Sequence, residues 1–296
     1  MVADAQLEAL RNIGGTLPLD LRRELCDCVL LGRLIRIAVP LRDIGRLPDV
    51  TSRLNISYHV GRESFQLRTD PGMRHWSSTA TACSDAQRHA IRFVYLHEQG
   101  EVCRVAEATD AANDDRTLGH LLGYPPCCVD AFDEWSENGV GIDPIGATLH
   151  MSGPGDRVMV YDGPSPFSRY FSGGLISHFP CSLTCARTRA LAAASLNSFR
   201  TAFPSLEASL MELEACFTLF QAHRGVGAWR RFKYVDDRVI VDPISFLGSG
   251  RLVNQVRDIT EIRVDSLHIR LLVAHAVVGT LAREGGFVGS SSWKGL

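Results

Sequence analysis

Two short segments of the chain each carry a pair of cysteines directly after a proline. The first is GYPPCCVDAF, with Cys127 and Cys128, and the second is HFPCSLTCARTRALA, with Cys181 and Cys185. Proline fits the first turn of a helix, where the free backbone N–H groups favour a thiolate. We therefore expect two helix starts that bring four thiols to one site.

Helix geometry indicates which of these thiols can share a centre. Cys181 and Cys185 stand at positions i and i+4, so they would lie on one face of a helix with Cβ atoms about 6 Å apart. Cys127 and Cys128 are neighbours and would point about 100° apart in a regular helix. We expect Cys181 and Cys185 to share a centre, which at least one cysteine of the first pair joins.

The spacing of the cysteines also bears on the kind of site. Four thiolates suit a closed structural metal site, whereas three with an open position suit a catalytic cluster. Structural zinc sites usually draw on CxxC spacings, which neither pair has. A [4Fe–4S] cluster accepts widely separated thiolates, so we favour it over zinc. A dithiol redox relay and a structural disulfide between the two segments stay open, and single cysteines often simply pack in a core.

Several residues near the cysteines are candidates for binding or catalysis. We assign catalytic roles to His178, Asp130 and Tyr124, the first two for proton movement. Arg187 and Arg189 could bind an anionic group of the substrate. Each has an ordinary alternative. Lone histidines are usually structural, a carboxylate in a first helical turn commonly compensates the helix dipole, and helix arginines usually face solvent.

Together, LLGYPPCCVDAF and HFPCSLTCARTRALA resemble a family of uncharacterised microbial proteins, a domain-of-unknown-function group with a GYPxCC segment and a later PCSxxC segment. The resemblance covers about residues 117–195. It is specific at Gly123, Tyr124, Pro125, Cys127, Cys128, Pro180, Cys181, Ser182 and Cys185. It implies one shared site, and because the family supplies no established reaction, it leaves the chemistry open.

Composition and charge exclude several other classes of protein. The 296 residues are 45% apolar and 22% charged, with a formal net charge of −2, so nucleic-acid binding is unsupported. No stretch approaches the roughly 20 apolar residues of a membrane span, and we see no signal peptide. We expect a cytoplasmic protein, in which the nine cysteines do not form an oxidised scaffold.

The elements that must position the cysteines indicate an α+β protein. Mixed or antiparallel sheets would flank a central helical, cysteine-rich segment. Residues 1–110 are predicted to be mostly strand, residues 111–215 to hold the cysteine motifs in helices, and residues 216–296 to be rich in strands. We expect the three regions to pack as one compact unit.

Two segments carry stronger local predictions outside the helices. Ile91–His97 and Glu101–Ala106 are rich in residues that favour strands and flank a turn signal, so we expect a hairpin. The stretch 139–174 is rich in glycine, proline and serine, which indicates a long irregular connection. Connections of this length often carry function, so this one could cover the site or contact a substrate.

Three helices are predicted around the motifs. One spans Arg116–Leu122, with Asp114 or Asp115 as its N-cap, and a second starts at Pro125-Pro126 and runs through CCVDAFDEWSEN. The third is the run CSLTCARTRALAAASLNSFRTAF, which ends before Pro204.

These observations favour an iron–sulfur enzyme, a lyase or transferase, that acts on a small polar substrate. An iron with an open position would supply Lewis-acid chemistry or carry sulfur for transfer. The chain lacks the CxxxCxxC triplet of radical-SAM enzymes, which argues against radical initiation by that route. The alternatives are a non-catalytic protein that zinc or a disulfide staples and that binds a partner, and a dithiol redox protein.

Overall fold

Helices and strands occur in separate runs along the chain, and antiparallel and mixed sheets combine with helices, which confirms the predicted α+β class. The computed structural model describes residues 4–14, 17–67, 80–85, 90–138, 144–152, 159–171, 173–221, 224–236, 238–264, 268–274, 276–282 and 286–291. Within these residues the strands pair antiparallel, except for one parallel pair, so the sheets are antiparallel and mixed.

The chain divides into two compact units. The first comprises residues 1–68, 76–133 and 193–207, and the second comprises residues 69–75, 134–192 and 208–296. These boundaries differ from the three consecutive regions predicted from the sequence. The reason is that the chain leaves the first unit after residue 133 and returns to it for residues 193–207, a path that no local pattern records.

The first unit is built around a sheet whose middle strand is β5 (Ile91–His97). Strands β1 (Ile35–Pro40) and β2 (Ser57–Val60) both pair antiparallel with β5. Strand β3 (Phe65–Leu67) pairs with β5 at one end and with β4 (Ala80–Ala82) along its length. The helices before and between these strands are α1 (Asp4–Gly14), α2 (Leu19–Leu31), η1 (Leu41–Arg46) and α3 (Leu47–Leu54).

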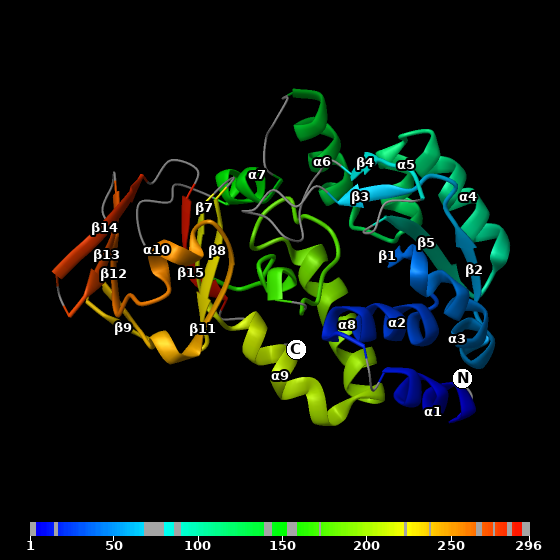
Figure 1. The fold of residues 1–296 in the computed structure, drawn as a ribbon, viewed down its shortest axis with the longest axis horizontal. Helices are drawn as coiled ribbons and strands as arrows, with labels where there is room; N and C mark the ends of the chain where they lie inside the picture. The colour runs from blue at the N-terminus through cyan, green and yellow to red at the C-terminus, as the bar shows by residue number, and fades with distance from the viewer. Residues whose placement is uncertain are drawn as a thin grey trace. The chain divides into compact units, whose positions relative to one another are not determined.

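The hairpin predicted after β5 is wrong, because Gly100–Ala111 forms helix α4. Cys103 and Ala106 are fully buried and stand three residues apart, which is the spacing of one helix face. This face packs against β2 and β5 (Figure 1), and burial of it outweighs the strand preference of the local sequence. Helix therefore exceeds strand among the described residues before position 110, contrary to the prediction.

The two helices that lead to the first cysteine pair form as predicted. Helix α5 (Asp115–Leu121) begins after Asp114, whose carboxylate accepts the backbone N–H of Thr117 at 3.0 Å. Helix α6 (Pro126–Asn138) has proline in its first position, where the missing N–H costs nothing.

The predicted irregular connection 139–174 contains regular elements in the part that is described. Helix α7 (Pro144–Met151) starts at a proline and buries Ile145 and Ala147, and it is followed by β6 (Met159–Tyr161) and η2 (Ser168–Phe171). Residues 139–143 and 153–158 lie outside the described residues. The high glycine and proline content predicted an irregular connection, but proline is also favoured at the first position of a helix, as it is in α7.

The helix predicted from Cys181 begins later. Residues 181–184 form turns, Cys185 donates its backbone N–H to Ser182 O at 3.2 Å, and helix α8 spans Ala186–Ala202. The chain then breaks at η3 (Pro204–Leu206), as predicted. Helix α9 (Glu207–Glu214) follows, and the chain turns to strand at Phe217.

Strands dominate the second unit after residue 216. One sheet has the order β11-β8-β7-β15-β6 and the other β14-β13-β12-β10-β9. The remaining elements are β7 (Phe217–Gln221), β8 (Gly225–Trp229), β9 (Phe232–Val235), β10 (Arg238–Val241), η4 (Pro243–Ser245), β11 (Phe246–Gly250), α10 (Val253–Val256), β12 (Glu261–Val264), β13 (His268–Val273), β14 (Ala276–Ala282) and β15 (Gly286–Ser291).

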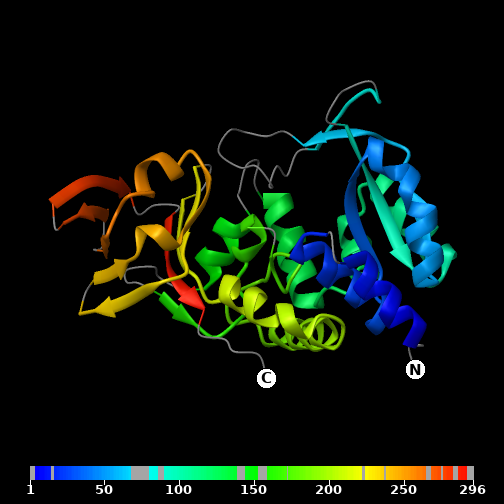
Figure 2. The same ribbon diagram turned by 60° about the horizontal axis from the view of Figure 1, so that its bottom comes forward.

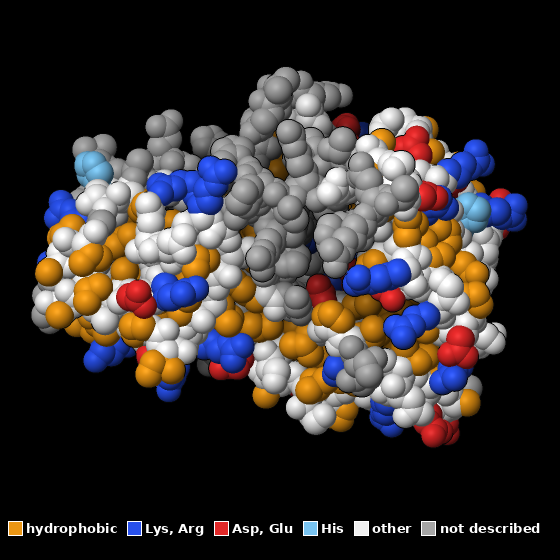
Figure 3. All heavy atoms as spheres, in the orientation of Figure 1, with side chains coloured by type: hydrophobic (Ala, Val, Ile, Leu, Met, Phe, Trp, Pro, Cys, Tyr) orange, Lys and Arg blue, Asp and Glu red, His pale blue; other side chains and the backbone are white. Residues whose placement is uncertain are grey.

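A shared hydrophobic core joins these two sheets. Trp229 and Val288 come from one sheet and Val239, Ile262 and Leu281 from the other, and all are buried in the same cluster. Figure 2 shows the strands of this unit grouped together, with β7 to β15 in yellow to red and β6 in green. Hydrophobic side chains also remain on the surface of this unit, interspersed with arginine and lysine (Figure 3).

Among the described residues, no helix combines the length and apolar character needed to cross a membrane.

Candidate metal centre

The sulfur atoms of Cys127, Cys128, Cys181 and Cys185 all lie within 4.8 Å of one another. The sequence predicted that at least one cysteine of the first pair lies near the second pair. In the structure both Cys127 and Cys128 do so. Among the described residues this is the set of His, Cys, Asp and Glu side chains close enough to hold a metal ion. All nine cysteines are described, and none is part of a disulfide.

The start of α6 places the first pair. Pro125 O accepts the backbone N–H groups of Cys128 at 2.8 Å and Val129 at 3.1 Å, so the helix closes its first turn on this residue. Cys127 and Cys128 therefore occupy the first turn, where the helix dipole favours negative charge on sulfur. Both thiols reach one group because they lie at the helix end.

The second pair lies on a loop that helix α7 supports. Thr148 on α7 donates its hydroxyl to Pro180 O at 2.6 Å, and Ser152 Oγ accepts the backbone N–H of Leu183 at 2.9 Å. Gly163 is required beside this loop, since a Cβ there would lie only 2.1 Å from Leu183 O. These contacts hold the loop on both sides of Cys181.

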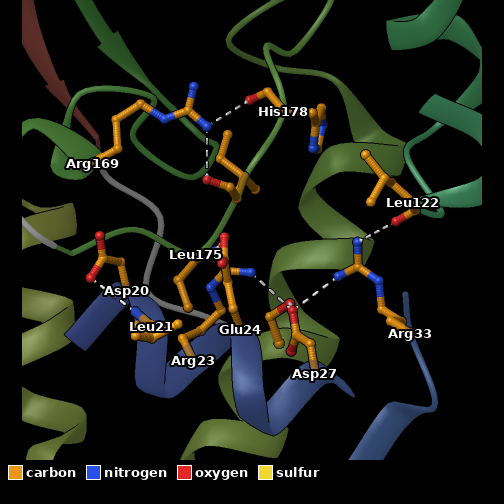
Figure 4. A network of polar contacts seen from close by, with 12 residues as sticks. Asp20, Leu21, Arg23, Glu24, Asp27, Arg33, Leu122, Arg169, Leu175 and His178 are labelled. Atoms are coloured by element: carbon orange, nitrogen blue, oxygen red, sulfur yellow. Dashed lines mark hydrogen bonds and ion pairs between the residues drawn. The ribbon is translucent and has the colours of Figure 1, made fainter. Parts of the chain in front are cut away.

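A buried histidine fastens the same loop to the start of α8. His178 Nε2 hydrogen-bonds Thr188 Oγ1 at 2.9 Å, and Thr188 lies three residues after Cys185. Arg169 Nη2 donates to His178 O at 3.4 Å (Figure 4) and to Ile176 O at 3.2 Å. Its guanidinium lies over the Phe179 ring. The predicted catalytic histidine thus has a clear structural partner, while its proposed proton transfer stays a prediction.

Exposure differs within the cysteine group. Cys128 and Cys185 are buried, whereas Cys127 and Cys181 are half-buried. One cysteine of each pair is therefore buried and the other is partly exposed. Such a group can hold a metal ion through four sulfurs or can leave one position accessible from outside.

The predicted acid Asp130 lies on the surface. Arg116 Nη1 pairs with Asp130 Oδ1 at 2.6 Å, and Arg116 Nη2 pairs with Asp133 Oδ2 at 2.8 Å. This ion-pair cluster joins α5 to α6 next to the cysteine motif. The ion pair with Arg116 is a structural partner for the Asp130 carboxylate, while its proposed role in proton movement stays a prediction.

The two predicted substrate-binding arginines have different surroundings. Arg187 is exposed, and Arg189 Nη1 pairs with Asp162 Oδ2 at 2.9 Å. Tyr124, predicted to be catalytic, packs partly buried against a core cluster that includes Leu122 and Tyr95. Arg187 is thus the arginine of this pair that extends into solvent, and the roles of all three stay predictions.

Other cysteines of the chain are deeply buried and show what an unreactive thiol looks like here. Burial raises the pKa of three core thiols to about 12, those of Cys26, Cys28 and Cys216, and that of Cys103 to about 11. These thiols stay protonated near neutral pH. None of these four buried cysteines belongs to the four-cysteine group. Burial of a cysteine is therefore not sufficient to place it in that group.

Sequence reasoning missed Thr148 and Ser152, which support the cysteine loop. They lie in the stretch that was predicted to be irregular. A partial signal was present, because Pro144 marks a helix start and Ser152, four residues after Thr148, directly follows the end of that helix. Comparisons add no further assignment: no protein-family model, no curated protein and no solved structure matches this chain.

Proposed function

We propose that Cys127, Cys128, Cys181 and Cys185 bind a metal centre as thiolates. The observation that carries this proposal is the mutual approach of all four sulfurs within 4.8 Å. Two segments that are far apart in the sequence supply them, and in each the first cysteine directly follows a proline. The same cysteines carry the resemblance to the GYPxCC and PCSxxC family, so we propose that this centre is the shared site of that family.

The sulfur spacing supports a single tetrahedral ion best. With a Zn–S bond of about 2.3 Å, four tetrahedral thiolates stand about 3.8 Å apart. A [4Fe–4S] cluster separates its thiolates further, because each one binds a different iron at a corner of the cluster. The observed limit of 4.8 Å accommodates the single ion with small side-chain shifts. A zinc ion bound by four thiolates is therefore the leading proposal, in place of the cluster favoured by sequence spacing.

An iron–sulfur enzyme is the second candidate, and the exposure of the thiols favours it. Cys127 and Cys181 are half-buried, and a catalytic centre keeps one coordination position open to solvent or substrate, whereas four protein ligands close a structural site. A cluster held by three cysteines would supply Lewis-acid chemistry or a bound sulfur at the open position, as in a lyase or transferase. The exposed Arg187 would then attract an anionic group of a small polar substrate, and His178 would move a proton.

Metal analysis of protein purified with and without oxygen separates the two candidates. One zinc per chain and a colourless protein support the leading proposal, whereas a brown protein with iron and inorganic sulfide in equal amounts supports the second. Peptide mapping of the same samples detects the alternative, a disulfide that links the cysteine segments. Protein that binds neither metal after reconstitution overturns both metal proposals.

A further inference from the structure

Asp27 on α2 is a fully buried carboxylate with four side-chain partners. Its Oδ2 atom accepts from Arg23 Nη1 at 3.1 Å, Arg33 Nη1 at 3.0 Å and Ser195 Oγ at 2.7 Å. Its Oδ1 atom accepts from Ser198 Oγ at 3.0 Å. Figure 4 shows the arginines converging on Asp27. We call these five residues the Asp27 network.

One arm of the network reaches the segment that carries the first cysteine pair. Arg33 Nη2 donates to Leu122 O at 3.1 Å, at the C-terminal end of α5 (Figure 4). Gly123 follows in the left-handed region, with φ of 71°, and turns the chain towards Pro125 and Cys127. Arg33 lies under this turn, 3.5 Å from the Cβ position of Gly123. The arginine therefore fixes the point at which the chain enters the cysteine motif.

The other arm reaches the helix that follows the second cysteine pair. Ser195 and Ser198 both lie on α8, and Cys185 directly precedes this helix. A continuous helix transmits position along its axis, because each residue adds about 1.5 Å in a fixed direction. The two serine contacts therefore restrain the axial position and rotation of α8, and with it the start where Cys185 lies.

We propose that Asp27 is a positioning residue of the cysteine site, an inference that rests on the proposed metal binding. One carboxylate restrains both cysteine-bearing segments without touching a ligand. A buried ion pair contributes little net stability compared with well-packed apolar side chains, but it requires one arrangement of its partners. A metal site needs its four sulfurs at defined distances from one another. The Asp27 carboxylate favours one arrangement of the two segments that carry these sulfurs.

The test is the affinity of the purified protein for Co²⁺, which reports thiolate ligands and tetrahedral geometry through its absorption spectrum. We expect Asp27→Asn to weaken Co²⁺ binding about 10-fold and to change the tetrahedral bands, since residues that orient ligands commonly affect affinity by 10- to 100-fold. The measurement is made below the unfolding temperature of each variant.

Glu261→Gln is the matched control. Glu261 is equally buried and pairs with Arg263 at 2.6 Å and Arg238 at 3.6 Å, within the second unit. It should lower the thermal midpoint as Asp27→Asn does, yet leave the Co²⁺ affinity and spectrum unchanged. Equal effects of both variants on Co²⁺ binding would show a general loss of stability and overturn the inference.

Milder variants keep the test decisive if Asp27→Asn does not fold. The double variant Ser195→Ala with Ser198→Ala removes the contacts of Asp27 to α8. Arg33→Met removes the other arm, that is, the contacts of Arg33 with Asp27 and with Leu122. Each should weaken Co²⁺ binding, and unchanged binding in both refutes the inference.

A measurement on metal-free protein separates this inference from the proposed function. Diamide, an oxidant that converts two nearby thiols to a disulfide, should crosslink the four-cysteine group more slowly in the positioning variants than in wild type. If wild type binds no metal but this difference is found, the proposed function fails and the positioning role stands. Equal crosslinking rates in all variants overturn the positioning role.

Discussion

Replacing each of the four cysteines by serine tests whether they act as one metal site. Structural zinc sites bound in small domains contribute about 10–16 kcal/mol of apparent binding free energy. All four sulfurs lie within the same 4.8 Å, so we assign each about a quarter of this energy. Loss of one thiolate should therefore cost about 2.5–4 kcal/mol, which raises Kd roughly 100- to 1,000-fold.

The assay is competition with a coloured chelator, which gives the zinc Kd of each single variant. Cys103→Ser is the control, because Cys103 is fully buried on α4 but lies outside the four-cysteine group. We expect the four site variants to lose affinity together and the control to keep that of wild type. A site variant with wild-type affinity would refute the tetrahedral assignment and show that the other three cysteines are sufficient to bind zinc.

Three further predictions concern the surroundings of the site. Glu214→Gln should destabilise the fold by about 2–4 kcal/mol in urea, because the fully buried Glu214 carboxylate accepts the N–H groups of Ser165 and Leu175 and the hydroxyl of Ser168. The half-exposed Glu212 offers a control, Glu212→Gln, for which we expect little change. Thr188→Val should cost about 1–3 kcal/mol by removing the buried contact to His178, and Thr188→Ser should restore most of it; equal stabilities of the two variants would contradict this. Stability in urea should fall as pH rises from about 9 towards 12, because burial raises the pKa of the three core thiols and the unfolded chain releases their protons first. A urea midpoint that is constant over this range would show that these thiols do not control the pH dependence.

Local sequence patterns predicted those helices whose ends carry their own signals. Asp114 caps α5, proline starts α6, and Pro204 ends the region of α8, each by chemistry contained within a few residues. The patterns failed where packing decided the outcome. Residues 101–106 favour strands locally, yet they form α4 because their buried face fits against β2 and β5.

The candidate site shows the same division. Residue types and proline positions identified four cysteines, but the assumption that Cys181 and Cys185 share a helix was wrong, since α8 begins only at Ala186. Their sulfurs converge because Thr148 and Ser152 hold the loop from outside. No spacing rule contains that support, since it depends on a helix that precedes the loop by some 30 residues.

The sequence by itself determined the chemistry available to this protein: four thiols in two pairs, each directly after a proline, and an α+β chain. The tertiary structure decided that the four sulfurs lie within 4.8 Å, that two of the four cysteines are partly exposed, and that Asp27 restrains both segments that carry them. The physical reason is that ligand types are properties of single residues. Distances between residues far apart in the chain arise only from the packing and buried hydrogen bonds of the whole fold.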